Sequence, residues 1–353
     1  MVSRLPRRRA ALIGRPGAAA AALVLAGLTP AHAQQPDYAR FREGVFLRYL
    51  DAQAGPMRRV PQLGLSFGGR TYRAVLDTGS TGVVVAADMI PGFDTLPSAG
   101  EGRLTYTSSG RVMIGQWVTT PLTLVGQDGA QVVTSPLPVL AVTRVECLRE
   151  ARDCTANDDP RTIAMIGVGF AREHDRQSQS TPDKNPLLHV APGGREQRHG
   201  YVLGTEGIHV GLTGANTQGS FQFVRLTRQP DAPDWSPVPA CIAINGQTPA
   251  ACGTILVDTG VAAMFMTVPE SQAGGSARQL PPGTTVSISA GPPEGRFPLY
   301  DFEVGADSPL APDGIHLDVS DERVFVNTSY HLLNGFDVLY DADGGYVGFR
   351  RRR

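Results

Sequence analysis

Charge is scarce in this sequence, and the two signs nearly cancel. Only 18% of the 353 residues are Asp, Glu, Lys or Arg, and the formal net charge is −1. A nucleic-acid partner would require at least a basic stripe, so the composition argues against one. Long apolar runs are missing after residue 33, which excludes a membrane-spanning helix from the rest of the chain. The 41 Gly and 28 Pro instead favour many short strands joined by turns.

The first 33 residues have the features of a signal peptide. Arg4, Arg7, Arg8 and Arg9 precede a run of small and apolar residues from Gly17 to Leu28, and Ala31-His32-Ala33 provides a small-x-small cleavage site. The run is too short to span a membrane. We therefore expect an exported protein, periplasmic or secreted. The adjacent arginines fit either the general route or the twin-arginine route.

Cysteine is rare, and its four copies fall into two close pairs, Cys147 with Cys154 and Cys241 with Cys252. In an exported protein, an even number at short separations predicts two local disulfides, with four unpaired buried thiols as the alternative. An Asn-Gly turn signal lies between the members of the second pair. No cysteine spacing matches a zinc site, and we expect neither a metal nor another cofactor.

One acidic motif occurs twice. Asp-Thr-Gly begins at Asp77 within AVLDTGST and again at Asp258 within ILVDTG. Each copy follows the same succession of an alternating strand, a glycine-containing turn and a second apolar strand. A lone tripeptide would be weak evidence, but two copies in the same context indicate an internal duplication. We place the boundary between the halves near Gly214, which gives segments 34–214 and 215–353.

The chemistry of two such turns differs from that of one. A strand that ends in Asp-Thr-Gly presents a carboxylate at the rim of a sheet, with glycine permitting the sharp turn and threonine offering a hydroxyl to a facing loop. Two carboxyl groups that face each other closely cannot both ionise, so they share a proton. The ionised member can then activate a water molecule, while the protonated member supports the oxyanion that forms on an amide carbonyl.

On these motifs, the chain from about Arg58 to Phe349 resembles the pepsin-like aspartic endopeptidases and would be an exported, bacterial member of that family. AMIGVGF is similar to the strand that threads the family's first active-site loop, and FDVLYDADGGYVGF is similar to its C-terminal hairpin. The resemblance implies an all-β, bilobal fold with two pseudo-twofold-related lobes and an active site in the cleft between them. It implies that Asp77 and Asp258 are catalytic, and that the enzyme acts as a monomer on extended polypeptides.

The resemblance also implies roles for residues around the two aspartates. The active-site loops would be supported by Thr78, Gly79, Ser80, Thr259 and Gly260. A flap hairpin, RLTYTSSGRVMIGQW, would close over the substrate strand and contact it through Tyr106, Thr107 and Ser108.

Three positions depart from the family pattern. Val261 follows the second motif where Ser80 follows the first, so we expect Asp258 to lack this donor, to favour its neutral form and to shift activity toward higher pH. Val84 replaces a tryptophan that bonds the flap tyrosine, and Ser329 replaces the second threading glycine.

Two alternatives remain beside the peptidase. The first is a pepsin-like protein that binds a partner without cutting it, as certain plant inhibitors of glycosidases do. Such relatives usually lose a catalytic aspartate, whereas this chain retains both. In the second alternative the two acids only form turns, which predicts that their carboxylates lie far apart.

Overall fold

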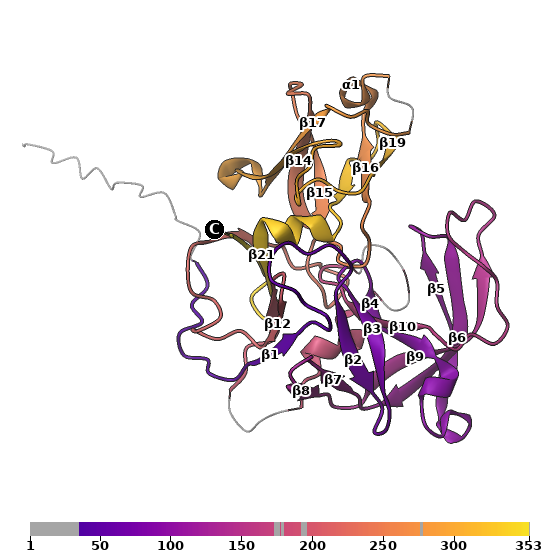
Figure 1. Ribbon diagram of the computed structural model, residues 1–353. Helices are drawn as coiled ribbons and strands as arrows, with labels where there is room; N and C mark the ends of the chain where they lie inside the picture. Colours follow the sequence, from indigo (N-terminus) through magenta and orange to yellow (C-terminus); the bar gives the residue numbers. More distant parts are fainter. Residues whose placement is uncertain (1–34, 173–176, 178–179, 192–195, 276–277, 353) are drawn as a thin grey trace, which may run out of the picture. The chain divides into compact units, whose positions relative to one another are not determined.

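The computed structural model describes residues 35–172, 177, 180–191, 196–275 and 278–352 (Figure 1). The predicted signal peptide lies outside the described residues. Strands dominate the described part of the chain and form three sheets. The prediction of an all-β protein is therefore confirmed. The physical reason is the spacing of turn-forming glycine and proline, which leaves room for short strands and for little helix.

The largest sheet has nine strands and is built from residues 62–168. In spatial order it contains β5 (Ser98–Tyr106), β6 (Arg111–Thr120), β9 (Leu137–Cys147), β4 (Thr81–Ala86), β10 (Ala164–Val168), β3 (Thr71–Asp77), β2 (Gln62–Ser66), β7 (Thr123–Val125) and β8 (Gln131–Val133). Asp77 ends β3, so the first Asp-Thr-Gly lies where this strand leaves the sheet.

A second sheet has seven strands and is built from residues 238–327. In spatial order it contains β18 (Phe297–Glu303), β17 (Thr285–Ala290), β14 (Val238–Ile244), β15 (Ala251–Leu256), β20 (Phe325–Asn327), β16 (Met264–Val268) and β19 (Ile315–Val319). The second Asp-Thr-Gly begins two residues after β15.

The third sheet combines strands from early and late parts of the chain. In spatial order it contains β1 (Val45–Arg48), β12 (Gly207–Val210), β11 (Gly200–Leu203), β21 (Phe336–Asp341), β22 (Tyr346–Arg351) and β13 (Phe221–Arg225). The expected division near Gly214 falls between β12 and β13. This sheet therefore contains strands from both expected halves, and apolar side chains of all three sheets, such as Leu76, Val326 and Tyr201, belong to one core cluster.

Helices are few and short among the described residues. The α-helix α1 (Glu270–Ala273) has a single turn, and the 3₁₀ helices are Ala87–Met89, Phe93–Thr95, Pro182–Lys184, Pro186–Leu188, Pro293–Gly295 and Tyr330–Asn334. In this part of the chain, no helix is long and apolar enough to cross a membrane.

Both predicted disulfides are present, Cys147–Cys154 and Cys241–Cys252, so the alternative of free thiols is wrong. The second bond joins residues that lie directly opposite each other on the antiparallel strands β14 and β15. The Asn-Gly turn signal between them is also confirmed: Asn245 and Gly246 both have positive φ angles, of 50° and 67°.

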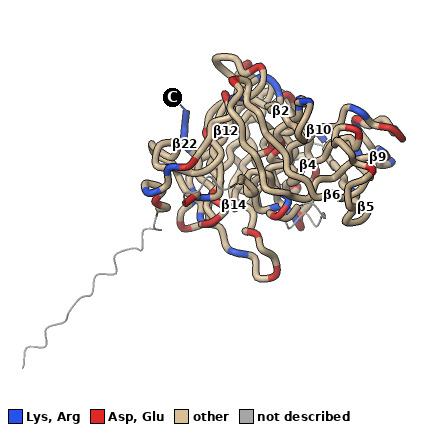
Figure 2. Tube along the Cα trace, turned by 90° about the horizontal axis from the view of Figure 1, so that it is seen from below, with Lys and Arg blue, Asp and Glu red and all other residues tan. Residues whose placement is uncertain are grey.

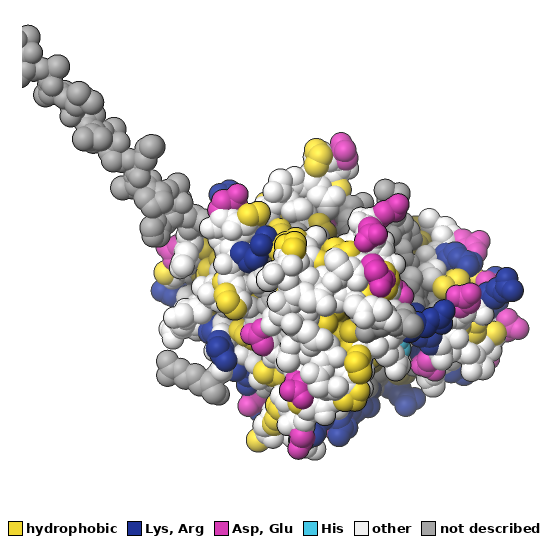
Figure 3. Space-filling model, turned by 90° about the horizontal axis from the view of Figure 1, so that it is seen from above, with side chains coloured by type: hydrophobic (Ala, Val, Ile, Leu, Met, Phe, Trp, Pro, Cys, Tyr) yellow, Lys and Arg dark blue, Asp and Glu magenta, His cyan; other side chains and the backbone are white. Residues whose placement is uncertain are grey.

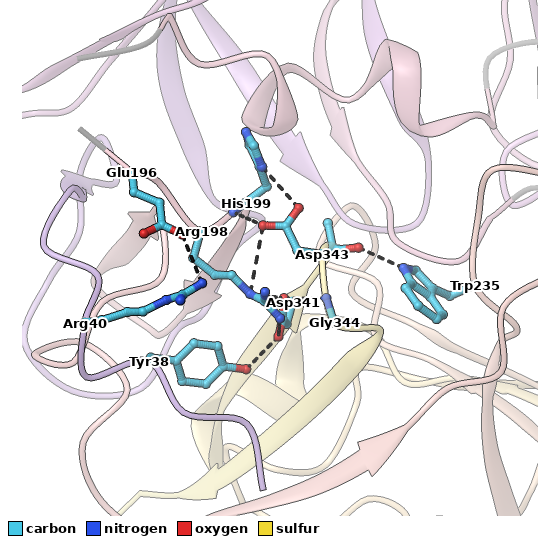
Figure 4. Close-up of polar contacts among 10 residues, drawn as sticks. Tyr38, Arg40, Glu196, Arg198, His199, Trp235, Asp341, Asp343 and Gly344 are labelled. Carbon is cyan, nitrogen blue, oxygen red and sulfur yellow. Dashed lines mark hydrogen bonds and ion pairs between the residues drawn. The ribbon is translucent and has the colours of Figure 1, made fainter. Parts of the chain in front are cut away.

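A buried ion pair ties the C-terminal hairpin β21–β22 to the rest of the third sheet (Figure 4). Asp341 is fully buried and accepts hydrogen bonds from Nε and Nη2 of Arg198, at 2.9 Å and 2.8 Å. The hydroxyl of Tyr38 donates a third, at 3.0 Å. A buried carboxylate requires such partners because its removal from water is costly. The early chain and the C-terminal hairpin are thereby held together.

Charged residues of both signs lie mainly along the outer turns (Figure 2). On the face that Figure 3 shows, acidic and basic side chains lie near one another and no continuous basic stripe is visible. This distribution agrees with the near-zero net charge of the sequence.

The first five residues of AMIGVGF form a strand that threads between the two strands that flank the first Asp-Thr-Gly. This strand, β10, pairs in parallel with β3, where Gly167 lies opposite Asp77, and antiparallel with β4, where Gly167 lies opposite Gly82. A Cβ atom on Gly167 would lie only 2.6 Å from the carbonyl oxygen of Gly82, so no larger residue fits there.

The same arrangement recurs around the second Asp-Thr-Gly. Strand β20 lies between β15, to which it is parallel, and β16, to which it is antiparallel. Ser329, two residues after β20, has φ of 62° and ψ of −176°, a region that is essentially restricted to glycine. A serine in this conformation stores backbone strain, which fits its expected place at the position of a threading glycine.

Replacement of Ser329 should reveal this strain. Ser329→Gly and Ser329→Ala both lose the hydroxyl that accepts a hydrogen bond from the His331 N–H, but only glycine adopts the backbone conformation without cost. We expect Ser329→Gly to be more stable than Ser329→Ala by about 1–3 kcal/mol. Urea unfolding of the two variants at one pH measures the difference, and equal stabilities would contradict strain at this residue.

Candidate active site

The structure brings the two Asp-Thr-Gly loops together. Asp77 and Asp258 are both buried, with exposed fractions of 4% and 6%. A Cβ atom on Gly79 would lie 2.3 Å from Cγ of Asp258, and one on Gly260 would lie 2.5 Å from Oδ1 of Asp77. Each carboxyl group therefore packs against the glycine of the opposite loop, and glycine alone leaves room for it. This geometry is the opposite of what the turn-forming alternative predicts.

Reciprocal hydrogen bonds between two threonines lock the loops in this position. The hydroxyl of Thr78 accepts a hydrogen bond from the Thr259 N–H at 3.0 Å and donates to the Val257 carbonyl at 2.6 Å. The hydroxyl of Thr259 accepts from the Thr78 N–H at 3.1 Å and donates to the Leu76 carbonyl at 2.6 Å. Both side chains are buried, so these bonds satisfy backbone groups that water cannot reach.

Asp77 receives two hydrogen bonds from its own loop. The Gly79 N–H donates to Oδ1 at 2.7 Å, and the Ser80 hydroxyl donates to Oδ2 at 2.5 Å. The structure thus places Gly79 and Ser80 where the sequence predicts loop support. Both oxygens of the Asp77 carboxyl group therefore have a hydrogen-bond donor within the loop.

Asp258 also has two donors, and one of them is absent from the sequence-based prediction. The Gly260 N–H donates to Oδ1 at 2.8 Å, and the side-chain amide of Asn327 donates to Oδ2. Val261 supplies no side-chain donor, as expected from its place after the motif, but Asn327 fills the place of the missing hydroxyl. Asn327 lies 69 residues further along the chain, and only the pairing of β20 with β15 brings it to the carboxylate. No local motif signals that role.

The charge state of the pair is dominated by burial. Burial and the neighbouring charge of Asp77 raise the pKa of Asp258 to about 7, while the hydrogen bonds from Asn327 and Gly260 act in the opposite direction. The shift toward a neutral Asp258 agrees in direction with the expectation from the sequence, but its cause is different. At mildly acidic pH, one carboxyl group of such a pair holds a proton that the other can share.

The segment RLTYTSSGRVMIGQW forms the predicted hairpin from β5 and β6. Tyr106 ends β5, and burial together with the charge of Asp77 raises the pKa of its phenol, which stays protonated at neutral pH. Val84, where the family has tryptophan, is fully buried in a small apolar cluster against which Tyr106 packs. Thr107 and Ser108 follow Tyr106 at the tip and line the same cavity as the two aspartates.

The loop closed by the Cys147–Cys154 disulfide braces the tip of this hairpin. Nη1 of Arg152 donates to the carbonyl oxygens of Thr107 and Ser108, both at 3.3 Å. The guanidinium carbon of Arg152 also lies 5.7 Å from the ring centroid of Phe265, on β16 of the other large sheet. One arginine therefore links the hairpin tip to the opposite side of the cavity.

The two aspartates open onto a cavity of about 1310 Å³. This exceeds the roughly 300–1,000 Å³ of a typical small-molecule site, so the cavity has room for a larger ligand. Apolar lining residues include Leu104, Met113, Met165, Phe265 and Met266. Charged residues such as Arg323 and Glu322 also line it.

A smaller cavity, of about 340 Å³, is lined by His199, Trp235 and Asp343 among others. Neither Asp77 nor Asp258 lines it. The ring nitrogen Nδ1 of His199 lies 3.1 Å from a carboxylate oxygen of Asp343, so these two polar groups engage each other.

One segment, Gly64–Gly68, fits the Gly-x-Ser-x-Gly pattern of serine hydrolases. Such a serine sits on a sharp turn from a strand into a helix. Here Ser66 ends β2 in the hairpin to β3, and its hydroxyl donates to the Gly69 carbonyl at 3.3 Å. The segment is a strand and turn, and it does not have the geometry of a nucleophile elbow.

No protein-family model matches this chain, and no curated protein is similar to it in sequence. Within the described residues, no cluster of three or more His, Cys, Asp or Glu side chains could hold a metal ion. The interpretation of the site therefore rests on its geometry.

The threonine contacts should make a large contribution to stability. Thr259→Val keeps the shape of the side chain but leaves the Thr78 N–H and the Leu76 carbonyl without partners, so we expect a loss of about 2–4 kcal/mol. Thr259→Ser retains the hydroxyl and should lose less than about 1 kcal/mol. Urea unfolding of both variants measures the two losses, and equal losses would show that the hydroxyl is not the stabilising group.

The raised pKa of Asp258 also predicts how stability depends on pH. The unfolded chain ionises Asp258 near its ordinary value of 3.8, whereas the folded protein retains the proton until about pH 7. Stability should therefore fall as pH rises from about 4 to about 7, by about 1.4 kcal/mol per unit of pKa difference. Asp77→Asn removes the facing charge, lowers the pKa of Asp258 and should make this fall smaller.

Urea unfolding at pH 4 and pH 8 tests this prediction. The Ser80 hydroxyl can accept a hydrogen bond from the new amide, so Asp77→Asn preserves the local contacts. Asp318→Asn removes an exposed carboxylate from the lining of the same cavity and serves as the control. Asp318→Asn should show the same pH dependence of stability as the wild type. The prediction is contradicted if Asp77→Asn does so as well.

Proposed function

We propose that this chain is an aspartic endopeptidase with a bilobal, pepsin-like fold. In this proposal, the nine-stranded and seven-stranded sheets are the cores of the two lobes, and the cavity lies between them. The observation that carries the proposal is the pair of buried carboxyl groups on two loops joined by reciprocal threonine bonds. The similar threading of β10 and β20 past the two loops supports a pseudo-twofold relation between the lobes.

The proposed reaction needs one proton shared by Asp77 and Asp258. The ionised carboxylate accepts a proton from a water molecule, whose oxygen attacks the amide carbonyl, while the protonated carboxyl group donates to the carbonyl oxygen. Collapse of the tetrahedral intermediate breaks the C–N bond, and the leaving amine takes a proton. Water is consumed, and the products are a carboxylic acid and an amine.

The proposed substrate is an extended polypeptide. The cavity is larger than a small-molecule site, and the edge strand β5 with its hairpin tip offers backbone groups to which a peptide strand can pair. Tyr106, Thr107 and Ser108 would contact the peptide from the hairpin, which acts as a flap. Both acids come from one chain, so a monomer contains the complete site. Two disulfides favour an exported, periplasmic or secreted protein.

We expect the mature protein to cut a reduced and alkylated, unfolded polypeptide, with activity declining above about pH 7 as Asp258 ionises. Asp77→Asn should lower kcat/KM by about 100-fold or more. Mass spectrometry of the products from pH 3 to pH 8 identifies the new termini. A hydroxyl-containing transition-state inhibitor of the pepstatin type should block cleavage.

The outcome separates the enzyme from the binding alternative. A folded wild-type protein that binds the polypeptide but leaves every peptide bond intact across this pH range would support a binding module. Cleavage that survives in Asp77→Asn would point to a contaminating protease or to a different site.

A further inference from the structure

The two halves of the candidate site obtain their second carboxylate donor from different places. In the first half, Ser80 stands directly after the motif and donates to Asp77. In the second half, Val261 stands at the same place and has no donor, and Asn327 donates to Asp258 from strand β20. Both donors reach the oxygen labelled Oδ2, so the two carboxyl groups receive the same number of bonds from different elements.

Strand register identifies the counterpart of Asn327 in the first half. Asn327 lies opposite Leu256, two residues before Asp258, and opposite Phe265 on the returning strand. Met165 lies opposite Val75, two residues before Asp77, and opposite Val84 on its returning strand. Asn327 and Met165 therefore occupy equivalent positions. A thioether cannot donate a hydrogen bond, so the donor and the apolar residue have exchanged places between the two halves.

The orientation of the Asn327 amide is fixed by a backbone group. Its Oδ1 accepts a hydrogen bond from the Ser329 N–H at 3.1 Å, and its Nδ2 donates to Oδ2 of Asp258. Rotating the amide by half a turn would set its carbonyl oxygen against the carboxylate and its NH₂ group against the Ser329 N–H. Both contacts would then be repulsive. The Ser329 N–H thus contributes to the site by fixing the orientation of the Asn327 amide.

An amide and a hydroxyl impose different limits on a carboxyl group. The Ser80 hydroxyl can donate to an ionised Asp77 or accept a hydrogen bond from a protonated one, because it rotates. The amide nitrogen of Asn327 can only donate. We propose that Asn327 is a positioning residue that keeps Oδ2 of Asp258 a hydrogen-bond acceptor and thereby confines the shared proton to the other oxygens of the pair. This proposal rests on the aspartic endopeptidase function proposed above.

The other groups around Asp258 do not replace this effect. The titratable groups that face it are Asp77 on the opposite loop, Tyr106 on the flap hairpin and Tyr340 on β21. Arg172 interacts with Tyr340. Asp77 and burial both favour a protonated Asp258, whereas the Asn327 hydrogen bond opposes protonation. Loss of the amide donor should therefore let the proton settle on Oδ2.

The test is a titration of the aspartate carboxyl carbons by NMR in protein labelled at the Asp side chains, which does not depend on activity. Asn327→Leu removes the donor at similar volume and should raise the higher pKa of the pair by about one unit. Asn327→Leu combined with Val261→Ser restores a donor at the position that Ser80 occupies in the first half. This double variant should recover at least half of the shift.

Met165→Leu is the matched control, because it changes the equivalent position without removing a donor and should leave the carboxyl titration unchanged. Asn327→Thr retains a polar side chain whose hydroxyl can donate or accept a hydrogen bond. It should therefore shift the higher pKa of the aspartate pair less than Asn327→Leu does. It also provides a second variant if Asn327→Leu does not fold. The alkaline limb of kcat/KM should move with the titration in each variant.

The proposal is overturned if folded Asn327→Leu titrates like the wild type, or if Met165→Leu shifts the pKa as much as Asn327→Leu. The same holds if Asn327→Leu does not fold and Asn327→Thr titrates like the wild type. Its failure is separable from failure of the proposed function. A wild type that cuts no polypeptide, with a shifted titration in Asn327→Leu, refutes the peptidase and keeps the positioning role. A wild type that cleaves polypeptides, with a titration in Asn327→Leu that matches the wild type, supports the peptidase and refutes the positioning role.

Discussion

The reciprocal contact between Thr78 and Thr259 is the constraint on which the site depends. Each hydroxyl bridges an N–H on one side and a carbonyl on the other, so neither loop can move without breaking buried hydrogen bonds in both. Without this contact the two carboxyl groups would move apart. Close together and buried, each would be costly to ionise, because it would be removed from water and would face a like charge. The threonine lock keeps them together, so that burial and then the charge of Asp77 raise the pKa of Asp258.

The reciprocal threonine contact is symmetric, but the two Asp-Thr-Gly loops differ in the residues that surround them. Ser80 serves Asp77 from the loop, whereas Asn327 serves Asp258 from the threading strand. Gly167 fits tightly between strands, whereas Ser329 holds the comparable place in a conformation that suits glycine. The Ser329 N–H donates to the Asn327 amide oxygen, and the Asn327 amide nitrogen donates to the Asp258 carboxylate. The backbone of Ser329 and the asymmetry of the acids are thus linked through Asn327.

The walls of the site are held by contacts far from the acids. Arg152, in the loop closed by the Cys147–Cys154 disulfide, supports the tip of the β5–β6 hairpin and reaches Phe265 on the opposite sheet. Asp341, Arg198 and Tyr38 fasten the C-terminal hairpin within the third sheet. The Arg152 contacts hold the hairpin at the cavity, and Asp341 with its partners stabilises the third sheet.

Much of this molecule follows from the order of its residues, because strand alternation, turn signals and cysteine spacing are local properties. They are sufficient for an all-β chain, for both disulfides, for the hairpin that turns after Tyr106 and for two acidic turns at Asp77 and Asp258. Asn327 lies beyond such reasoning. Its role depends on which strand lies beside β15 and on the N–H of Ser329. A hydrogen bond across 69 residues is decided by the packing of the whole sheet. The sequence by itself determined that two acids exist in matching turns, while the tertiary structure alone decided which neighbour holds each of them, because a hydrogen bond depends on distance and direction in space.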